Sequence, residues 1–104
     1  MAAPDEIIHQ SLRLRIMAAL YAARDIEPLE FSRLKALLNA TDGNLGSHLA
    51  TLETAGYITI EKGFAGKKPR TRLLLTARGA SAFRDHTNYL RAIIEAAEPD
   101  GAAP

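Results

Sequence analysis

The hydrophobic positions in the first part of the chain follow a helical period. Apolar side chains recur at intervals of four residues, at Ile8, Leu12, Ile16 and Leu20. This spacing places them on one face of an amphipathic helix, which we expect over residues 7–23. Pro28 interrupts the pattern because it lacks the backbone donor that a helix interior needs. We expect a very short strand at Leu29 and a second, shorter helix over residues 30–38.

A third helix is predicted after a short turn. Leucines at positions 45, 49 and 52 have the spacing of one buried helical face, and the helix is expected over residues 42–55. The Thr41 hydroxyl can accept a backbone N–H of its first turn, and Gly56 suits the left-handed conformation that ends many helices. Because only residues 39–41 separate it from the preceding helix, the two are expected to form a helix-turn-helix.

The pattern then changes from a helical period to that of strands. Residues 57–62 are rich in β-branched and aromatic side chains, and residues 71–75 form a second predicted strand. The segment between them, residues 63–69, contains two glycines, one proline and two lysines, which is typical of a loop. We therefore predict a β-hairpin, or wing, after the helix-turn-helix, with a basic tip at residues 63–70.

The last predicted helix begins near Thr76, which can cap it, and ends near residue 97. Its stripe follows steps of four and three residues, at Thr76, Ala80, Phe83, Thr87, Leu90, Ile94 and Ala97. Such heptad spacing is typical of a helix that pairs with another helix. Together these elements predict an α+β fold: a winged helix-turn-helix with a three-helix core, a β-hairpin wing and a C-terminal helix over residues 76–97.

The length of the chain predicts a single domain, and the distribution of its charges reveals one basic segment. A chain of 104 residues suits a single domain, which we place at residues 7–97 with flexible tails at residues 1–6 and 98–104. The formal net charge is only +1. Its distribution is uneven, because six basic residues and no acid lie between Lys62 and Arg78. We therefore expect one surface that receives an anionic partner.

Several function classes find no support in the sequence. The chain has no cysteine, which excludes disulfides and thiolate metal sites and fits the reducing cytoplasm, where we expect the protein to act. No apolar run reaches the ~18 residues that a membrane span needs, and the first ten residues do not resemble a signal peptide. No phosphate-cradling glycine loop or nucleophile elbow is present, so we expect neither an enzyme nor a bound cofactor.

Three motifs follow one another along the chain. They are His9-x-x-x-Arg13-Leu14-x-Ile16, then the continuous run from Thr41-Asp42-Gly43-Asn44 to Ala55-Gly56-Tyr57-Ile58, then Lys67-x-Pro69-Arg70-Thr71 leading into Leu75-Thr76-x-x-Gly79. In this order they resemble the winged-helix DNA-binding regulators of the MarR/ArsR-like group, over roughly residues 7–97. The resemblance implies that the third helix enters the major groove of double-stranded DNA and that the wing touches the adjacent backbone or minor groove. It also implies that the C-terminal helix joins two subunits into a homodimer that regulates transcription.

The face of the third helix opposite its leucines is polar and can exchange hydrogen bonds with base edges or phosphates. The DNA contacts expected there are Thr41, Asn44, Ser47, His48 and Thr51. Any surface helix has a polar outer face, so the helix-turn-helix context is what favours DNA contact. Gly43 and Gly46 are poor helix formers. A close approach to another backbone, either of DNA or of the second helix, would account for them.

The wing is expected to contact DNA through cations, each of which can neutralise a phosphate and release a counterion. The expected contacts are Lys67, Lys68, Arg70 and Arg72. Strand alternation puts the two arginines on one face, and Arg70 or Lys68 could enter a narrow minor groove. A basic loop can also serve solubility alone. For Arg13 and Arg15 of the first helix, phosphate contact and a solvated surface stay equally open.

The length of the C-terminal helix predicts self-association. Roughly 22 residues span ~33 Å, which is more than the rest of a small domain can cover. The expected dimer contacts are Phe83, Thr87, Leu90 and Ile94. The alternative is that this helix folds back on the first helix of the same subunit, which we expect for part of the stripe.

Other interpretations stay open beside DNA binding. Winged helices also serve as protein-interaction modules without DNA binding, but such modules carry apolar residues where this chain has a basic wing and a polar helix face. Asp85-His86 is faintly similar to the zinc sites of some ArsR-like proteins. No companion histidine stands at helical spacing, so no metal site is expected. His9 is expected to have a structural role. A small-molecule effector at the dimer interface stays open, and no residue identifies one.

Overall fold

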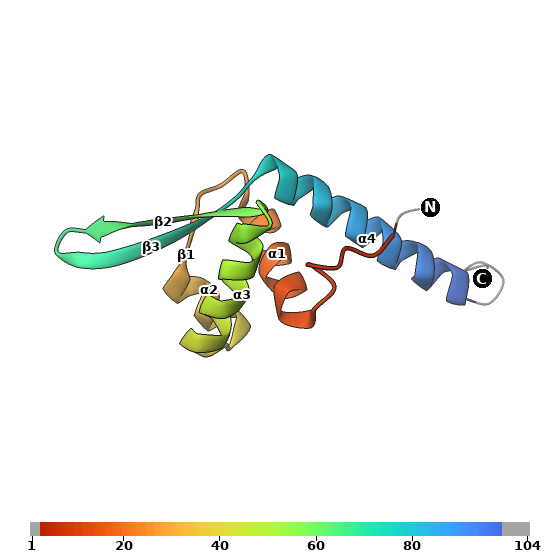
Figure 1. Cartoon of the computed structure of the whole chain (residues 1–104), viewed down its shortest axis with the longest axis horizontal. Coiled ribbons are helices and arrows are strands. Elements are labelled where there is room, and N and C mark those ends of the chain that lie inside the picture. The colour runs from red at the N-terminus through yellow and green to blue at the C-terminus, as the bar shows by residue number, and fades with distance from the viewer. Residues whose placement is uncertain (1–2, 99–104) are drawn as a thin grey trace.

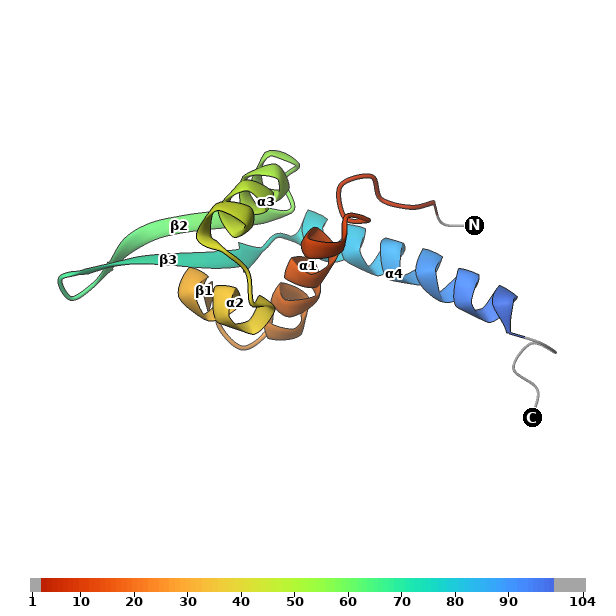
Figure 2. The same ribbon diagram turned by 90° about the horizontal axis from the view of Figure 1, so that it is seen from below.

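The computed structural model describes residues 3–98 and shows two extensions on opposite sides of a helical core (Figure 1). The molecule measures 59 × 26 × 24 Å. Its core contains α1 (Ser11–Ala23), α2 (Phe31–Leu38) and α3 (Asp42–Thr54). A long hairpin extends from one side of this core, and α4 (Ala77–Ala97) extends from the other, as a second view also shows (Figure 2).

Three antiparallel strands form one small sheet. They are β1 (Leu29–Glu30), β2 (Ile58–Ala65) and β3 (Lys68–Leu75), in the order β1-β3-β2. Leu73 of the central strand lies opposite Leu29 on one side and Ile60 on the other. Directly opposed residues share a face of the sheet, so this register gives the sheet one apolar face next to the helices.

The core lies where the three helices meet this face of the sheet. Its fully buried members come from the predicted stripes of the first three helices and from the sheet: Ile8, Ile16, Met17, Leu34, Leu45, Leu52 and Leu73. Leu49 is 2% exposed, so the three leucines of α3 face inward as their spacing predicted. The predicted α+β winged helix-turn-helix fold is confirmed.

The start of the first helix differs from the prediction. α1 begins at Ser11 and not at residue 7, and the Gln10 side chain caps it by accepting the Arg13 backbone N–H. Upstream, the Asp5 carboxylate accepts the backbone N–H groups of Ile7 and Ile8, at 2.8 and 2.9 Å. This carboxylate organises a separate turn before the helix, because aspartate side chains compete with the helix for nearby backbone donors.

The wing is a longer hairpin than predicted. The strands continue through most of the segment assigned to a loop and leave only Gly66-Lys67 as the turn. Gly66 has φ 65°, a value that glycine reaches without steric cost. Pro69 is accommodated within β3 because β1 pairs only with Arg72 and Leu73, so that at position 69 the strand has a neighbour on one side alone.

The junction between α3, β2 and α4 explains the Leu-Thr-x-x-Gly motif. The Thr76 hydroxyl accepts the Gly79 backbone N–H at 2.9 Å and donates to the Gly56 carbonyl oxygen at 2.7 Å. A side chain at position 79 would overlap the Tyr57 carbonyl oxygen. Glycine therefore lets the first turn of α4 pack directly against the backbone of Tyr57, three residues after the end of α3.

The two halves of α4 have different surroundings. In the first half, the Phe83 ring packs against Tyr21 of α1 with 4.9 Å between ring centroids, so this part of the stripe folds back on the same chain. Residues 91–98 are all exposed. Of the segments expected to be flexible tails, residues 1–2 and 99–104 lie outside the described residues. Asp5, which belongs to the tail predicted at residues 1–6, forms hydrogen bonds with Tyr57 and His86.

Candidate nucleic-acid interface

The outer face of α3 presents most of its predicted DNA contacts to solvent. Asn44 and Ser47 are exposed. Thr41 is exposed too, and its hydroxyl caps the helix by accepting the Asn44 backbone N–H at 3.2 Å. Thr51 is half-buried, and its hydroxyl donates to the Ser47 carbonyl oxygen at 3.3 Å. The polar end of α3 nearest its N-terminus is therefore the most accessible part of this face.

His48 and the arginines of α1 form contacts with other residues of the same chain. The Arg13 guanidinium donates to the Ile7 carbonyl oxygen at 2.6 Å and lies 3.5 Å from His48 Nδ1. The Arg15 guanidinium donates to the Leu38 carbonyl oxygen, the last of α2, at 3.1 Å. Both arginines therefore tie helices together in this structure, which is a role that the helical pattern alone did not indicate.

The two glycines of α3 have open space in front of them. A Cβ atom at Gly43 or at Gly46 would meet no atom within 4 Å. Close packing against the second helix, one of the two explanations predicted for these residues, is therefore excluded. Of those two explanations, approach by an external backbone is the one left.

The register of the hairpin divides the wing into two faces. The inner face, next to α3, carries the opposed pairs Ile60–Leu73, Lys62–Thr71 and Phe64–Pro69. The outer face carries the pairs Glu61–Arg72, Gly63–Arg70 and Ala65–Lys68. Arg70 and Arg72 therefore lie together, as alternation predicted, but they share with Lys68 the face turned away from α3.

Acidic residues accompany the two arginines of the outer face. Arg72 Nη2 lies 3.2 Å from a Glu61 carboxylate oxygen, and Arg70 Nε lies 3.8 Å from one of Glu30. Ion pairs at this exposure contribute little to stability, but they offset part of the positive charge. Lys67 and Lys68 are exposed at the tip, and neither forms an ion pair within residues 3–98.

A groove of about 620 Å³ separates α3 from the inner face of the wing. Its lining residues are Gly46, Leu49, Ala50 and Glu53 of α3, Ile60, Lys62 and Thr71 of the wing, and Phe31 of α2. Lys62 was counted in the basic segment but was not predicted as a contact. A prediction with strands running up to a two-residue turn would have included Lys62. The register that such a turn sets places the Lys62 side chain on the face next to α3.

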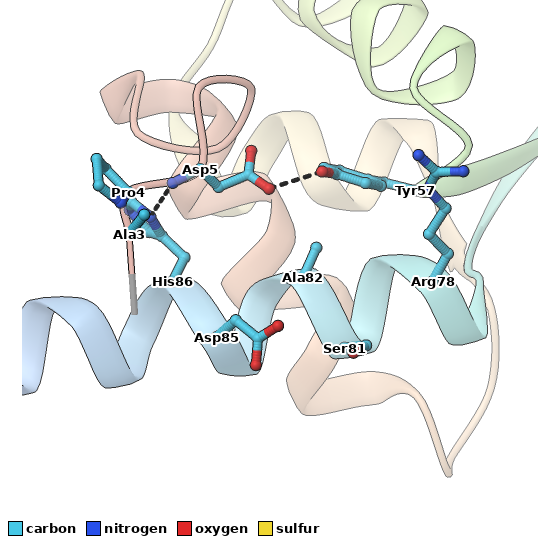
Figure 3. A pocket seen from close by; sticks show the side chains of 9 residues that line it. All are labelled: Ala3, Pro4, Asp5, Tyr57, Arg78, Ser81, Ala82, Asp85 and His86. Carbon is cyan, nitrogen blue, oxygen red and sulfur yellow. Dashed lines mark hydrogen bonds between the residues drawn. The ribbon is translucent and has the colours of Figure 1, made fainter. Parts of the chain in front are cut away.

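A second polar site lies at the other end of the core, where the N-terminal segment crosses α4 (Figure 3). The Tyr57 hydroxyl donates to Asp5 Oδ2 at 2.6 Å, and the Asp5 backbone N–H donates to His86 Nδ1 at 3.0 Å. Arg78 and Asp85 line the same cavity of about 680 Å³. The network joins three segments that are far apart in sequence.

This environment shifts three pKa values. Burial, together with the Asp5 carboxylate, raises the pKa of Tyr57 to about 12. Burial lowers the pKa of His86 below its ordinary value, and the Asp5 charge only partly opposes that effect. Burial would raise the pKa of Asp5, but hydrogen bonds from Tyr57, Ile8 and Ile7 outweigh it and hold that pKa below its ordinary value.

The role of this site is structural. His86 is 1% exposed and accepts a backbone N–H, so it is the histidine with a structural role. His9 was expected in that role but lies at the surface, 3.5 Å from Glu6. Nothing in the sequence pattern marked His86 as buried, because its burial depends on the docking of a segment 81 residues away. No three histidine or acidic side chains within residues 3–98 are grouped to hold a metal ion.

Comparisons with known proteins agree with this architecture. Residues 12–94 match the family described as winged helix DNA-binding domain, which is not an enzyme class. The uncharacterized protein MJ0432 of Methanocaldococcus jannaschii is 36% identical over 90 residues, covering 86% of this chain and 91% of that protein. None of the helices in the described part of the chain combines the length and apolar character required to cross a bilayer.

Solved structures share the fold. A transcriptional regulator homologue from Pyrococcus horikoshii OT3 superposes with a TM-score of 0.83 at 30% identity, covering 91% of both chains. FabT of Streptococcus pneumoniae, solved in complex with DNA, superposes with a TM-score of 0.55 at 20% identity, covering 90% of this chain and 69% of its own. The protein therefore belongs to the winged helix DNA-binding domain family, whose members include transcriptional regulators.

Proposed function

We propose that this protein is a sequence-specific regulator of transcription that binds double-stranded DNA as a homodimer through residues 7–97. α3 occupies the major groove, and the wing contacts the adjacent backbone or minor groove. One observation carries the proposal: α3, whose outer face exposes Asn44 and Ser47, and the inner face of the wing, which carries Lys62, lie on either side of one groove. A polyanion can contact both at once.

Sequence recognition is assigned to the first turns of α3. Residues near the N-terminus of a recognition helix are those that reach base edges, and Asn44 and Ser47 are exposed there. The open space in front of Gly43 and Gly46 supports this placement, because a helix without side chains at these positions lets a DNA backbone come close. His48 and Thr51 would contact DNA farther along the helix, and Thr41 would contact a phosphate beside the cap.

Affinity is assigned to the wing. Lys67 and Lys68 at the tip and Lys62 on the inner face supply phosphate contacts that do not depend on sequence. Arg70 and Arg72 contribute less by this account, because a phosphate must displace their glutamate partners. A winged helix that serves only protein docking would not require this concentration of cations beside a polar helix.

The homodimer is assigned to the second half of α4. Ile93 and Ile94 are 49% and 59% exposed, and Leu90 is half-buried on the same stripe. Pairing of two such helices around a two-fold axis would remove these side chains from water. Thr87 would lie at the inner edge of the contact, and Phe83, packed on Tyr21, would border it.

Selection of bound fragments from genomic DNA tests the proposal. The full-length protein should recover one palindromic motif at moderate salt, because a two-fold dimer reads two half-sites. Asn44→Ala combined with Ser47→Ala should keep the fold and lose discrimination by roughly tenfold, since one good base contact contributes about 1–3 kcal/mol. Recovery of random fragments, or unchanged discrimination in the double variant, would contradict the assignment.

A companion variant examines the glycines. Gly46→Ala should raise the midpoint of thermal unfolding, because alanine favours the helix by about 1 kcal/mol over glycine and the added Cβ meets no atom of the chain. Its affinity for the selected duplex should nevertheless fall. Higher stability with unchanged DNA affinity would show that no DNA backbone approaches this position.

A further inference from the structure

The tip of the wing carries an apolar pair among its cations. Phe64 on β2 lies directly opposite Pro69 on β3. Phe64 is 69% exposed and Pro69 is exposed as well. An aromatic ring left in water at the end of a hairpin loses the stabilisation that burial would give it, about 25 cal/mol per Å² of apolar surface. The fold does not use this ring, because it does not belong to the core or to the apolar shell packed on it.

The position of this pair is specific. Phe64 and Pro69 lie on the inner face of the wing, two residues beyond Lys62 and Thr71, which line the groove beside α3. The neighbours of the ring along β2 are Gly63 and Ala65, and Gly66 begins the turn. Because these side chains are small or absent, the ring is the bulkiest apolar group at the tip.

The residues near the Phe64 ring indicate the chemistry of the partner that it can contact. Lys67 and Lys68 are exposed beside it, so a matching surface must offer both negative charge and flat apolar groups. The minor groove of DNA offers phosphates at its edges and the sugars and stacked bases between them. Phenylalanine and proline are among the side chains that proteins insert between base steps from the minor groove.

We propose that Phe64, supported by Pro69, forms an apolar wedge that enters the minor groove next to the site of α3 and partly unstacks one base step. This inference rests on the proposed DNA binding. The wedge adds affinity that does not depend on salt, and it favours flexible pyrimidine–purine steps because these unstack most easily. The lysines beside it hold the phosphates on both sides of the step.

Fluorescence of 2-aminopurine reports the unstacking directly. Hydroxyl-radical footprinting of the wild-type complex locates the step under the wing, and the probe is then placed at that step of the selected duplex. Wild-type protein should raise the probe fluorescence, and Phe64→Ala should abolish the rise. Phe64→Ala should also bind about tenfold more weakly, as expected for one stacking contact, with an unchanged salt slope. Phe64→Leu should retain part of both effects.

Ile26→Ala is the matched control, because Ile26 is 79% exposed in the loop after α1 and lies near the base of β3, not at the tip of the wing. It should bind and unstack like the wild type. If Phe64→Ala matches the wild type in affinity and in probe fluorescence, the wedge is wrong although DNA binding stands. If Phe64→Ala weakens binding and the probe stays dark even with wild-type protein, the ring contacts DNA without unstacking it, which also overturns the wedge. If the wild-type protein binds no duplex, the proposed function fails together with the wedge.

Discussion

The wing and the second half of α4 are both exposed extensions of one core, and their surfaces are opposite in chemistry. The wing ends in Lys67 and Lys68, whereas α4 exposes Ile93 and Ile94. They point to opposite sides of the molecule (Figure 1). Neither extension is needed to close the core, whose buried side chains end at Leu73 of the sheet and at His86 of α4.

This difference teaches that exposure alone does not define a function. A cationic hairpin interacts with a polyanion over several ångströms and loses that interaction in salt. An apolar helical stripe interacts only on contact, and salt does not weaken it. The two extensions should therefore be separable by mutation, with the core between them unaffected.

The largest effect is expected from breaking the helical extension. Leu90→Asp combined with Ile94→Asp places two charges on the stripe, and the protein should sediment as a monomer at micromolar concentration. Affinity for a palindromic duplex should fall by at least about 100-fold, because two linked half-sites bind far more tightly than one. Asn88→Asp, which adds a charge off the stripe, is the control and should stay dimeric. A dimeric double variant, or a monomeric wild type, would reject this interface.

A smaller effect is expected from breaking the wing. Lys67→Ala combined with Lys68→Ala should weaken binding to all duplexes alike and reduce the slope of log affinity against log salt by about 1.8, or about 0.9 for each phosphate that a lysine no longer neutralises. Arg72→Ala is the comparison, because Glu61 already pairs with Arg72, and it should change the slope less. Fluorescence anisotropy over a salt series measures both. A weakening confined to one DNA sequence would contradict a backbone role.

The smallest effect is expected in the core between the two extensions. Below pH 6.5 an unfolded histidine takes up a proton, but His86 in the folded protein has a lowered pKa and resists it. Stability is therefore full above pH 6.5 and should fall toward pH 5 by about 1 kcal/mol, the size of one hydrogen bond. Urea denaturation at each pH measures it. Asp5 does not interfere, because its pKa lies below 3.8.

His86→Asn sharpens this measurement. The asparagine amide oxygen can take the place of Nδ1 as acceptor for the Asp5 backbone N–H, and it does not titrate. The variant should therefore lose most of the pH dependence between pH 5 and 7 while its sedimentation and salt slope stay those of the wild type. A pH profile identical to that of the wild type would show that His86 does not cause it.

Local signals predicted the elements of the fold well. The leucines of α3, the capping hydroxyls of Thr41 and Thr76 and the left-handed Gly56 each act within one turn of the chain, so a sequence pattern can show them. The element bounds that the pattern missed are the start of α1 and the ends of the wing strands. The Asp5 carboxylate caps a separate turn at Ile7 and Ile8 ahead of α1, and strand pairing extends into the Gly- and Pro-containing segment of the wing.

The sequence by itself determined the number, type and order of the elements and the segment where the cations gather, because these depend on periods of two or 3.6 residues and on neighbours along the chain. Only the tertiary structure decided which cations stand beside α3, since that depends on the register of Lys62 and Arg72 across the hairpin. It likewise decided that His86 is buried and that Phe64 is not. Burial is set by segments that meet in space after folding, and no local pattern records which segments these will be.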